Sequence, residues 1–309
     1  MEKILTVAQV IAPIFGVPLL GVLARRKRLM TAENVQGLQE LAVQFGLPCV
    51  MFNACLTTNM GMESVSSMVL LLPLMLISAT MGFRLAKRKL PYHNLPMLFA
   101  AQETGMLGIP LYMILFGSEQ AYRMGVLDLT QAVIAIPTIA LLTAAAGEKP
   151  GPVEILKKVF SSPLMLMSLL GLALNFSGVG AVLERVGLLP VLTETTTFLA
   201  EPVSALMIFS VGYNFTMDAN RRKRIFQISG LHLAVFTLLC LVIQGGLCLV
   251  PQVDAMTRWA IVLYCYLPAS YLAPGLGHSE EDAAVASGVC SVLTLVGMLV
   301  FCVMAGIVA

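Results

Sequence analysis

Charged residues are scarce in this chain of 309 residues: Asp, Glu, Lys and Arg make up 12% of it, whereas apolar residues make up 58%. Soluble domains carry about 25% charged residues, so the composition excludes an ordinary soluble protein. A membrane-spanning helix needs about 20 apolar residues, which leaves room for about ten helices and for no sizeable soluble domain. The sequence therefore predicts an all-α polytopic membrane protein.

Catalytic and metal-binding signatures are also missing from the sequence. No glycine-rich phosphate loop precedes a Lys-Ser or Lys-Thr pair, which argues against ATP hydrolysis. The chain has no His-Glu-x-x-His motif and no Cys-x-x-Cys pair, and its cysteines lie in or beside apolar runs, as small buried hydrophobes do. We therefore expect no enzyme activity, no resident cofactor or metal centre, and no nucleic-acid partner.

The basic residues follow every second apolar run. Fifteen of the 19 Lys and Arg residues come after the first, third, fifth and seventh runs. Such clusters mark the cytoplasmic side, so we expect a multi-pass protein of the plasma or bacterial inner membrane with both termini outside the cytoplasm. The ten predicted spans are 5–24, 38–58, 67–86, 95–116, 121–145, 162–181, 195–217, 225–250, 257–277 and 282–308.

Two of these spans, the fourth and the ninth, combine proline, glycine and polar residues within a few positions. Proline removes a backbone donor and clashes with the preceding turn, and glycine weakens a helix. Interrupted apolar segments at matching places in two halves are the best sequence pointer to a transporter site. We expect breaks at 103–110 and 268–274, which contain Glu103, Thr104, Gly105, Gly108 and Pro110 in the first and Pro268, Ser270, Tyr271 and Pro274 in the second.

The broken spans divide the chain into two similar halves. Each half has five spans, an odd number, so the second half enters the membrane from the opposite side, as in an inverted repeat. The predicted organisation is a first five-helix repeat at 1–146, a cytoplasmic linker at 147–158 and a second, inverted five-helix repeat at 159–309.

Several short motifs resemble those of the auxin efflux carrier family, which includes the plant PIN transporters and bacterial malate and malonate permeases. They are Leu-Pro-Cys-Val-Met-Phe-Asn at 47–53, Thr-Gly-Met-Leu-Gly-Ile-Pro-Leu at 104–111, Pro190, Gly212, and Pro268 with Ser270. The resemblance covers nearly the whole chain.

This family resemblance implies ten helices in a five-plus-five inverted repeat, with two crossing broken helices and a scaffold part. The plan is of the kind found in the antiporter NhaA and in bile-acid symporters. The resemblance further implies alternating access, a homodimer, and transport of small organic anions such as auxin-like acids or mono- and dicarboxylates. The family usually has Asn where this chain has Glu103, and Gln131 matches a glutamine near the substrate site of the plant transporters.

Glu103 is the most informative polar residue of the apolar spans. A carboxylate at the bilayer centre costs about 2.5–3.5 kcal/mol, so such residues are rare and usually functional. No Lys or Arg lies in the same span to neutralise it. Our hypothesis is that Glu103 carries a proton, or helps to bind sodium, coupled to transport; the alternative is a protonated Glu103 that serves packing alone.

Further polar residues accompany the breaks. Asp128 and Gln131 lie one turn apart in the fifth span, and polar residues also occur in the second and seventh spans. The exposed N-termini of half-helices offer partial positive charge to a substrate carboxylate. The candidate substrate- or ion-binding residues are Asn53, Glu103, Thr104, Gly105, Gly108, Pro110, Asp128, Gln131, Asn214, Pro268, Ser270, Tyr271 and Pro274.

The expected function is therefore secondary transport of a small organic anion by alternating access, with the substrate and the membrane lipids as partners. Two alternatives stay open. One is a sodium-coupled symporter of a bile-acid-type organic solute, and the other is a membrane sensor that binds a ligand without moving it.

Overall fold

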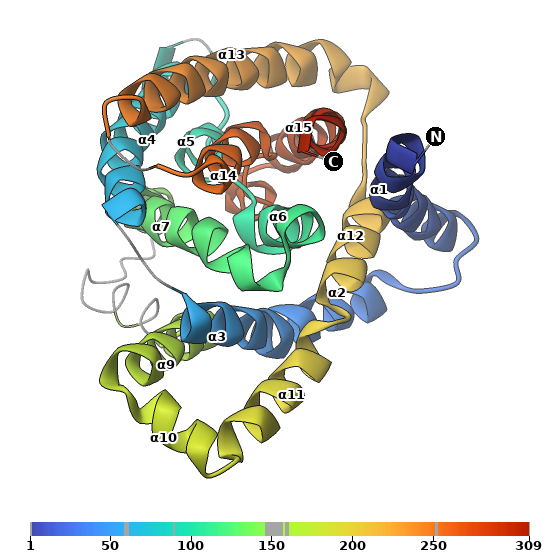
Figure 1. The fold of residues 1–309 in the computed structure, drawn as a ribbon. Helices are drawn as coiled ribbons and strands as arrows, with labels where there is room; N and C mark the ends of the chain where they lie inside the picture. Colours follow the sequence, from blue (N-terminus) through green and yellow to red (C-terminus); the bar gives the residue numbers. More distant parts are fainter. Residues whose placement is uncertain are drawn as a thin grey trace.

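The computed structural model describes residues 2–58, 62–88, 90–145, 157, 161–250 and 253–308. In these residues the regular elements are helices, with no β-strand and one isolated antiparallel bridge between Gln102 and Ala269 (Figure 1). The predicted all-helical class is thus confirmed. The predicted linker at 147–158 lies outside the described residues except for Lys157.

The first half of the chain contains the helices up to α7. They are α1 (Glu2–Arg26), α2 (Ala32–Leu41), η1 (Ala42–Gly46), α3 (Leu47–Thr57), α4 (Met62–Arg88), α5 (Leu95–Ala100), η2 (Thr104–Gly108), α6 (Ile109–Phe116), η3 (Ser118–Gln120) and α7 (Ala121–Ala145).

The second half contains the remaining helices. They are α9 (Pro163–Ser177), α10 (Val179–Arg185), α11 (Leu188–Ala200), α12 (Val203–Asn214), η4 (Ala219–Arg221), α13 (Arg222–Leu247), α14 (Ala255–Tyr266), η5 (Ala273–Leu276) and α15 (Glu280–Val308).

Six helical segments among the described residues are long and apolar enough to cross a membrane, and two shorter apolar segments accompany them. The chain is therefore a multi-pass α-helical membrane protein. The six are Ala32–Thr57, Ser64–Arg88, Ser118–Thr143, Leu188–Asn214, Ala219–Leu247 and Glu280–Val308, and the shorter two are Thr104–Phe116 and Pro163–Ser177.

Two predicted spans begin earlier in the structure than their hydropathy indicates. The second span was expected from 38, but α2 starts at Ala32 because the side chain of Thr31 accepts a hydrogen bond from the N–H of Asn34 in a capping box. The seventh was expected from 195, but α11 starts at Leu188, after Gly187 turns the chain with a φ of +74°. These helix ends are set by local capping residues, which lie outside the apolar stretch from which each span was predicted.

The helices pack into two groups (Figure 1). In what we call the flanking group, α1 packs along α12, and α3 packs along α9 and α11. In the central group, α4 packs against α5, α7 and α13, while α14 and α15 pack against α13. The flanking group comprises α1, α2, α3 and α9 to α12, and the central group comprises α4 to α7 and α13 to α15.

Glycines let α1 and α12 touch through their backbones. A Cβ atom on Gly21 would lie 2.2 Å from the carbonyl oxygen of Phe209, and one on Gly212 would lie 2.1 Å from that of Pro18. Such distances leave no space for any side chain. Close approach at small residues is a common basis of helix association in membranes, where lipid removes most of the hydrophobic driving force.

Candidate functional site

Two stretches of unwound backbone interrupt the apolar helices of the central group. One lies between α5 and η2, at residues 101–103, and the other lies between α14 and η5, at residues 267–272. We call these two stretches together the junction. Backbone N–H and C=O groups released in the middle of a membrane must be satisfied by protein or by water, so the partners of the junction are informative.

The two unwound stretches satisfy part of each other's backbone. They run antiparallel, with Gln102 opposite Ala269. Two backbone hydrogen bonds flank this pair and join the fourth predicted span to the ninth. They run from the N–H of Glu103 to the carbonyl of Pro268 (2.8 Å) and from the N–H of Ser270 to the carbonyl of Ala101 (3.0 Å).

The first break lies upstream of its predicted position at 103–110. Residues 104–108 form a π-helical turn that runs directly into α6, so the helical segment passes through Pro110 without unwinding. The second break includes Pro268, while Pro274 lies in the first turn of η5. Two of the three prolines therefore lie in helical segments and not in the unwound backbone.

Glu103 binds backbone groups on both sides of the junction. Its Oε2 accepts a hydrogen bond from the N–H of Tyr271 (2.7 Å), and its Oε1 accepts one from the N–H of Met106 (3.3 Å). The side chain is buried, with 8% of the residue exposed. The carboxylate thus caps the helical segment that continues into α6 and also fixes the second unwound stretch.

The side chain of Gln131, on α7, hydrogen-bonds to the backbone of the first break at Gln102. Its amide oxygen accepts from the backbone N–H of Gln102 (2.8 Å) and from the hydroxyl of Tyr264 (2.8 Å). Its amide nitrogen donates to the carbonyl of Gln102 (3.0 Å), the hydroxyl of Thr104 (2.9 Å) and the carboxylate of Asp128 (2.8 Å). The side chain therefore pairs with Gln102 as an additional strand would.

Asp128 belongs to the same network. The hydroxyl of Thr104 donates to its carboxylate, and Gln131 donates to the same oxygen. Asp128 is half-buried, whereas Thr104 is buried. The structure therefore brings two acidic side chains, Glu103 and Asp128, to the junction within one chain of contacts.

The remaining predicted residues of the two breaks line or shape the junction. The hydroxyl of Tyr271 hydrogen-bonds with that of Thr294 on α15 (2.8 Å). A Cβ atom on Gly108 would lie 2.6 Å from a methyl carbon of Leu267 and 2.8 Å from that of Met124, so a larger residue there would require these side chains to shift. At Gly105, by contrast, the nearest neighbour of such an atom would be a methyl carbon of Leu47 at 4.0 Å, which leaves room toward the flanking group.

Two predicted site residues lie elsewhere. Asn53 accepts a hydrogen bond from Thr196 (2.6 Å) and donates to Thr197 (3.2 Å), so it ties α3 to α11 within the flanking group. Asn214 is exposed at the end of α12. The structure does not bring either residue to the junction; polar side chains in membranes also serve to join helices, as Asn53 does here.

Gln102 was not predicted as a site residue. It is 2% exposed, and neither polar atom of its side chain has a hydrogen-bond partner among the described residues. Buried polar groups are normally paired, so such an amide is a candidate ligand-binding group. Its only sequence signal is an amide next to Glu103 in an apolar span.

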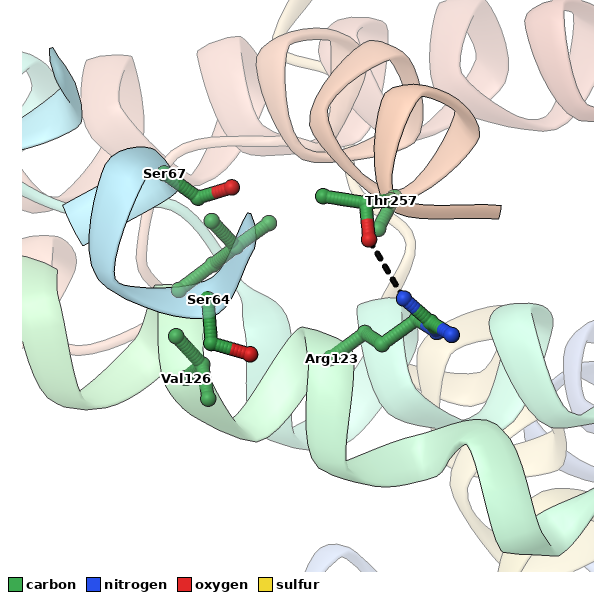
Figure 2. A pocket seen from close by; sticks show the side chains of 7 residues that line it. Ser64, Ser67, Arg123, Val126 and Thr257 are labelled. Carbon is green, nitrogen blue, oxygen red and sulfur yellow. Dashed lines mark hydrogen bonds between the residues drawn. The ribbon is translucent and has the colours of Figure 1, made fainter. Parts of the chain in front are cut away.

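A small pocket lies at a different place, among the N-terminal ends of α4, α7 and α14 (Figure 2). Arg123 and Thr257 point into it and hydrogen-bond to each other. The other lining residues are Ser64, Ser67, Val126, Leu127 and Ala260.

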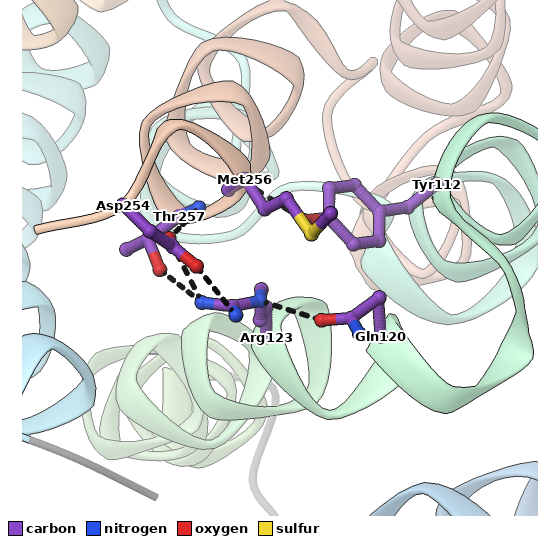
Figure 3. Close-up of polar contacts among 6 residues, drawn as sticks. All are labelled: Tyr112, Gln120, Arg123, Asp254, Met256 and Thr257. Atoms are coloured by element: carbon purple, nitrogen blue, oxygen red, sulfur yellow. Dashed lines mark hydrogen bonds and ion pairs between the residues drawn. The ribbon is translucent and has the colours of Figure 1, made fainter. Parts of the chain in front are cut away.

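The positive charge of Arg123 is paired with a carboxylate of the same chain (Figure 3). Its guanidinium forms an ion pair with Asp254 (2.7 Å) and also donates to Gln120 (3.0 Å). Nearby, the hydroxyl of Tyr112 donates to the carbonyl of Met256 (2.9 Å), which joins α6 to α14. We therefore interpret this region as a clamp between helices of the central group and not as an anion site.

The fold and the junction together define a class: a multi-pass α-helical membrane protein in which two interrupted helices meet at a buried polar junction. No known protein-family model matches the chain, and no curated protein matches its sequence. Functional assignment therefore rests on the residues and their geometry.

Proposed function

We propose that this chain is a secondary transporter of small organic anions, a member of the auxin efflux carrier family that works by alternating access. The observation that carries the proposal is the junction. Two interrupted helices, one in each half of the chain, expose backbone to each other beside Glu103, Asp128 and the unpartnered amide of Gln102. In secondary transporters, discontinuous helices of this kind form the substrate and ion sites.

We further propose ten spans in a five-plus-five inverted repeat, and the helix contacts support this plan. Exchanging the two halves pairs the first span with the sixth and the second with the seventh. The contact of α1 with α12 then corresponds to that of α9 with α3, and both contacts exist. The contacts of α4 with α5 and α7 correspond to those of α13 with α14 and α15, which also exist.

The proposed orientation places both termini outside the cytoplasm. Arg25 donates hydrogen bonds to the carbonyls of Tyr213 (3.1 Å) and Phe215 (2.8 Å), so the basic cluster 25–28 lies beside the end of α12, close in sequence to the cluster 221–224. Two clusters on the same side agree with the positive-inside rule. The family resemblance also supports a homodimer surrounded by lipid.

In the proposed mechanism, Glu103 is the coupling group and carries a proton. A neutral carboxyl crosses an apolar environment at much lower cost than a carboxylate, which suits a group that must accompany its substrate. Sodium is the alternative coupling ion, because the oxygens of Thr104, Asp128 and Glu103 lie around the same break and are hard ligands. That alternative corresponds to a sodium-coupled symporter of a bile-acid-type solute.

A thermal-shift screen followed by liposome flux tests the proposal. Purified protein is heated with mono- and dicarboxylates, including aromatic acids, at one acidic and one neutral pH, in sodium and in potassium salts. A ligand of the folded state raises its apparent stability. We expect one carboxylate class to stabilise the protein and to enter liposomes with a pH dependence that Glu103→Gln removes.

Other outcomes of this screen separate the alternatives. A requirement for sodium would favour the symporter, and binding without flux would favour a sensor. Stabilisation by cations or amines alone would overturn the proposal of an anion carrier.

A further inference from the structure

The carboxylate of Glu103 occupies a position that suits a carboxylate ligand. Two backbone N–H groups from different segments, those of Met106 and Tyr271, each donate to one of its oxygens. The antiparallel pairing of the junction brings these segments together. We call this pair of N–H groups the amide cradle. A carboxylate group on a small organic acid has the same two oxygens and the same charge.

The electrostatic surroundings make the cradle unable to hold two carboxylates. The other acidic side chain facing Glu103 is Asp128, on α7. Tyr271 and, on α15, Cys290 are the further ionisable side chains close to it. All three groups are neutral or negative, so an incoming anion finds no positive side chain among them and is repelled by an ionised Glu103.

We propose that Glu103 is a tethered occupant of the substrate's carboxylate position, and that a substrate carboxylate enters the amide cradle only when Glu103 is protonated. The inference rests on the proposed function and specifies its ligand step. The proton comes from solution and stays on one carboxyl oxygen. That oxygen becomes a donor, so the side chain no longer accepts hydrogen bonds from both N–H groups. The occupied site then carries one negative charge fewer than it would if an ionised Glu103 and the substrate carboxylate were both present.

Two further observations indicate a ligand at this place. Gln102, next to Glu103, is 2% exposed and has an amide without a partner among the described residues. A buried amide in this condition destabilises the folded state unless something binds it. Beside the cradle, a Cβ atom on Gly105 would lie 4.0 Å from a methyl carbon of Leu47, an ordinary van der Waals contact, so one further methyl group fits there. The junction therefore has a buried amide without a partner among the described residues, beside a glycine that leaves room for one more group.

The test uses acetate and formate as probes, because each consists of little more than a carboxylate. The intact protein in detergent or nanodiscs is heated in sodium acetate, sodium formate or sodium chloride of equal ionic strength, at acidic and neutral pH. Three variants are compared with the wild type: Glu103→Ala, which empties the cradle; Glu103→Gln, a neutral mimic of protonated Glu103; and Glu119→Ala, which removes an exposed carboxylate in η3.

We expect acetate to raise the melting temperature of Glu103→Ala above that in chloride, saturably and at both pH values. Glu103→Gln should respond at neutral pH as well, although it keeps one accepting oxygen. The wild type and Glu119→Ala should respond only at acidic pH. At 100 times its Kd a ligand stabilises the folded state by about 2.7 kcal/mol, a readily measured shift.

Two results would overturn the inference. One is an equal acetate response of the wild type at neutral and acidic pH, and the other is no acetate-specific response in Glu103→Gln, which preserves the shape of the side chain if Glu103→Ala does not fold. Liposome flux is scored separately. Flux of carboxylates without any acetate response would leave the proposed transporter standing and refute the cradle, whereas acetate binding without flux would do the reverse.

Discussion

Gln131→Met is the substitution that most directly tests the architecture of the junction. Methionine keeps the length and approximate volume of glutamine but can replace none of its hydrogen bonds. In the native protein the Gln131 amide lies within hydrogen-bond distance of five partner atoms, two on Gln102 and one each on Thr104, Asp128 and Tyr264, and its oxygen and two N–H hydrogens can make four full bonds at a time. The substitution therefore removes polar pairing with little change in packing.

The expected loss of stability follows from what is left unpaired. The N–H of Gln102 loses its side-chain partner at a residue that is 2% exposed, whereas its C=O keeps a hydrogen bond from the N–H of Thr104 (3.0 Å). One such unpaired group costs about 1–3 kcal/mol. Side-chain hydrogen bonds in membrane proteins average about 0.6 kcal/mol, so the four that one amide can make at a time give about 2.4 kcal/mol. Both routes agree on a destabilisation of about 2 kcal/mol.

The assay is reversible unfolding in mixed detergent and dodecyl sulfate. The single tryptophan, Trp259, lies on α14, the helix that leads into the second break, and reports the transition by fluorescence. Thr130→Val is the matched control, because Thr130 is equally buried on α7 but bonds only to Val126 of its own helix (2.7 Å). If the two variants unfolded alike, the junction would not depend on Gln131 and our reasoning would be refuted.

Three other experiments test the packing of the helices. Gly212→Ala should cost at least about 3 kcal/mol, because its Cβ would lie 2.1 Å from backbone, whereas Gly16→Ala, with no atom within 4 Å, should be neutral in the same unfolding assay. A double-mutant cycle with Arg123→Gln and Asp254→Asn should give a coupling free energy of only about 1 kcal/mol, since 38% of the Asp254 side chain is exposed. The Arg123 side chain is only 9% exposed, so part of this coupling should persist in 1 M salt, and a value near zero there would contradict the prediction. Asn94→Leu should lower stability by about 2 kcal/mol, because the Asn94 amide donates to the carbonyl of Ala273 in η5 (3.1 Å) and to that of Asp282 in the first turn of α15 (2.9 Å); an unchanged midpoint would contradict this role.

Much of the fold can be predicted from hydropathy, because lipid forces apolar runs into helices. What hydropathy misses are ends that depend on local hydrogen bonds. The capping box at Thr31 and the left-handed Gly187 extend helical segments beyond the apolar windows of the second and seventh spans. A window of apolar residues contains no information on such caps.

The junction was predicted in outline because helix breakers and acidic residues are conspicuous in an apolar sequence. Its details were harder to predict. Pro110 suggested a break that the structure places seven or more residues earlier, since the π-helical turn at 104–108 runs into α6 and carries the helix through Pro110. Asn53 looked like Gln131 in sequence, yet Asn53 joins two helices of the flanking group while Gln131 binds the junction. Only the hydrogen-bond partners of each side chain, which the sequence does not give, distinguish a helix-joining amide from one that binds the junction.

The hydrogen bonds of the junction also bear on which motion would accompany the proposed transport. The side chains that hold it come from the central group: Gln131 from α7, Tyr264 from α14 and Thr294 from α15. Toward the flanking group, Gly105 faces the apolar side chain of Leu47. Opening the junction would leave several buried polar groups unpaired, whereas sliding past Leu47 exchanges one apolar contact for another. For the proposed transporter we therefore expect an elevator-like movement of the whole central group and not local rocking around the junction.

Pulsed electron paramagnetic resonance on pairs of spin labels can separate these motions. Leu169 on α9, Leu238 on α13 and Leu76 on α4 are all exposed, so labels there should not disturb packing. For an elevator, the distance between Leu169 and Leu238, which joins the two groups, should show two populations whose ratio changes with ligand. The distance between Leu76 and Leu238, both in the central group, should stay in one narrow population. If instead this second distance also changed with ligand, the central group would not move as a rigid unit, and rocking at the junction would be the better description.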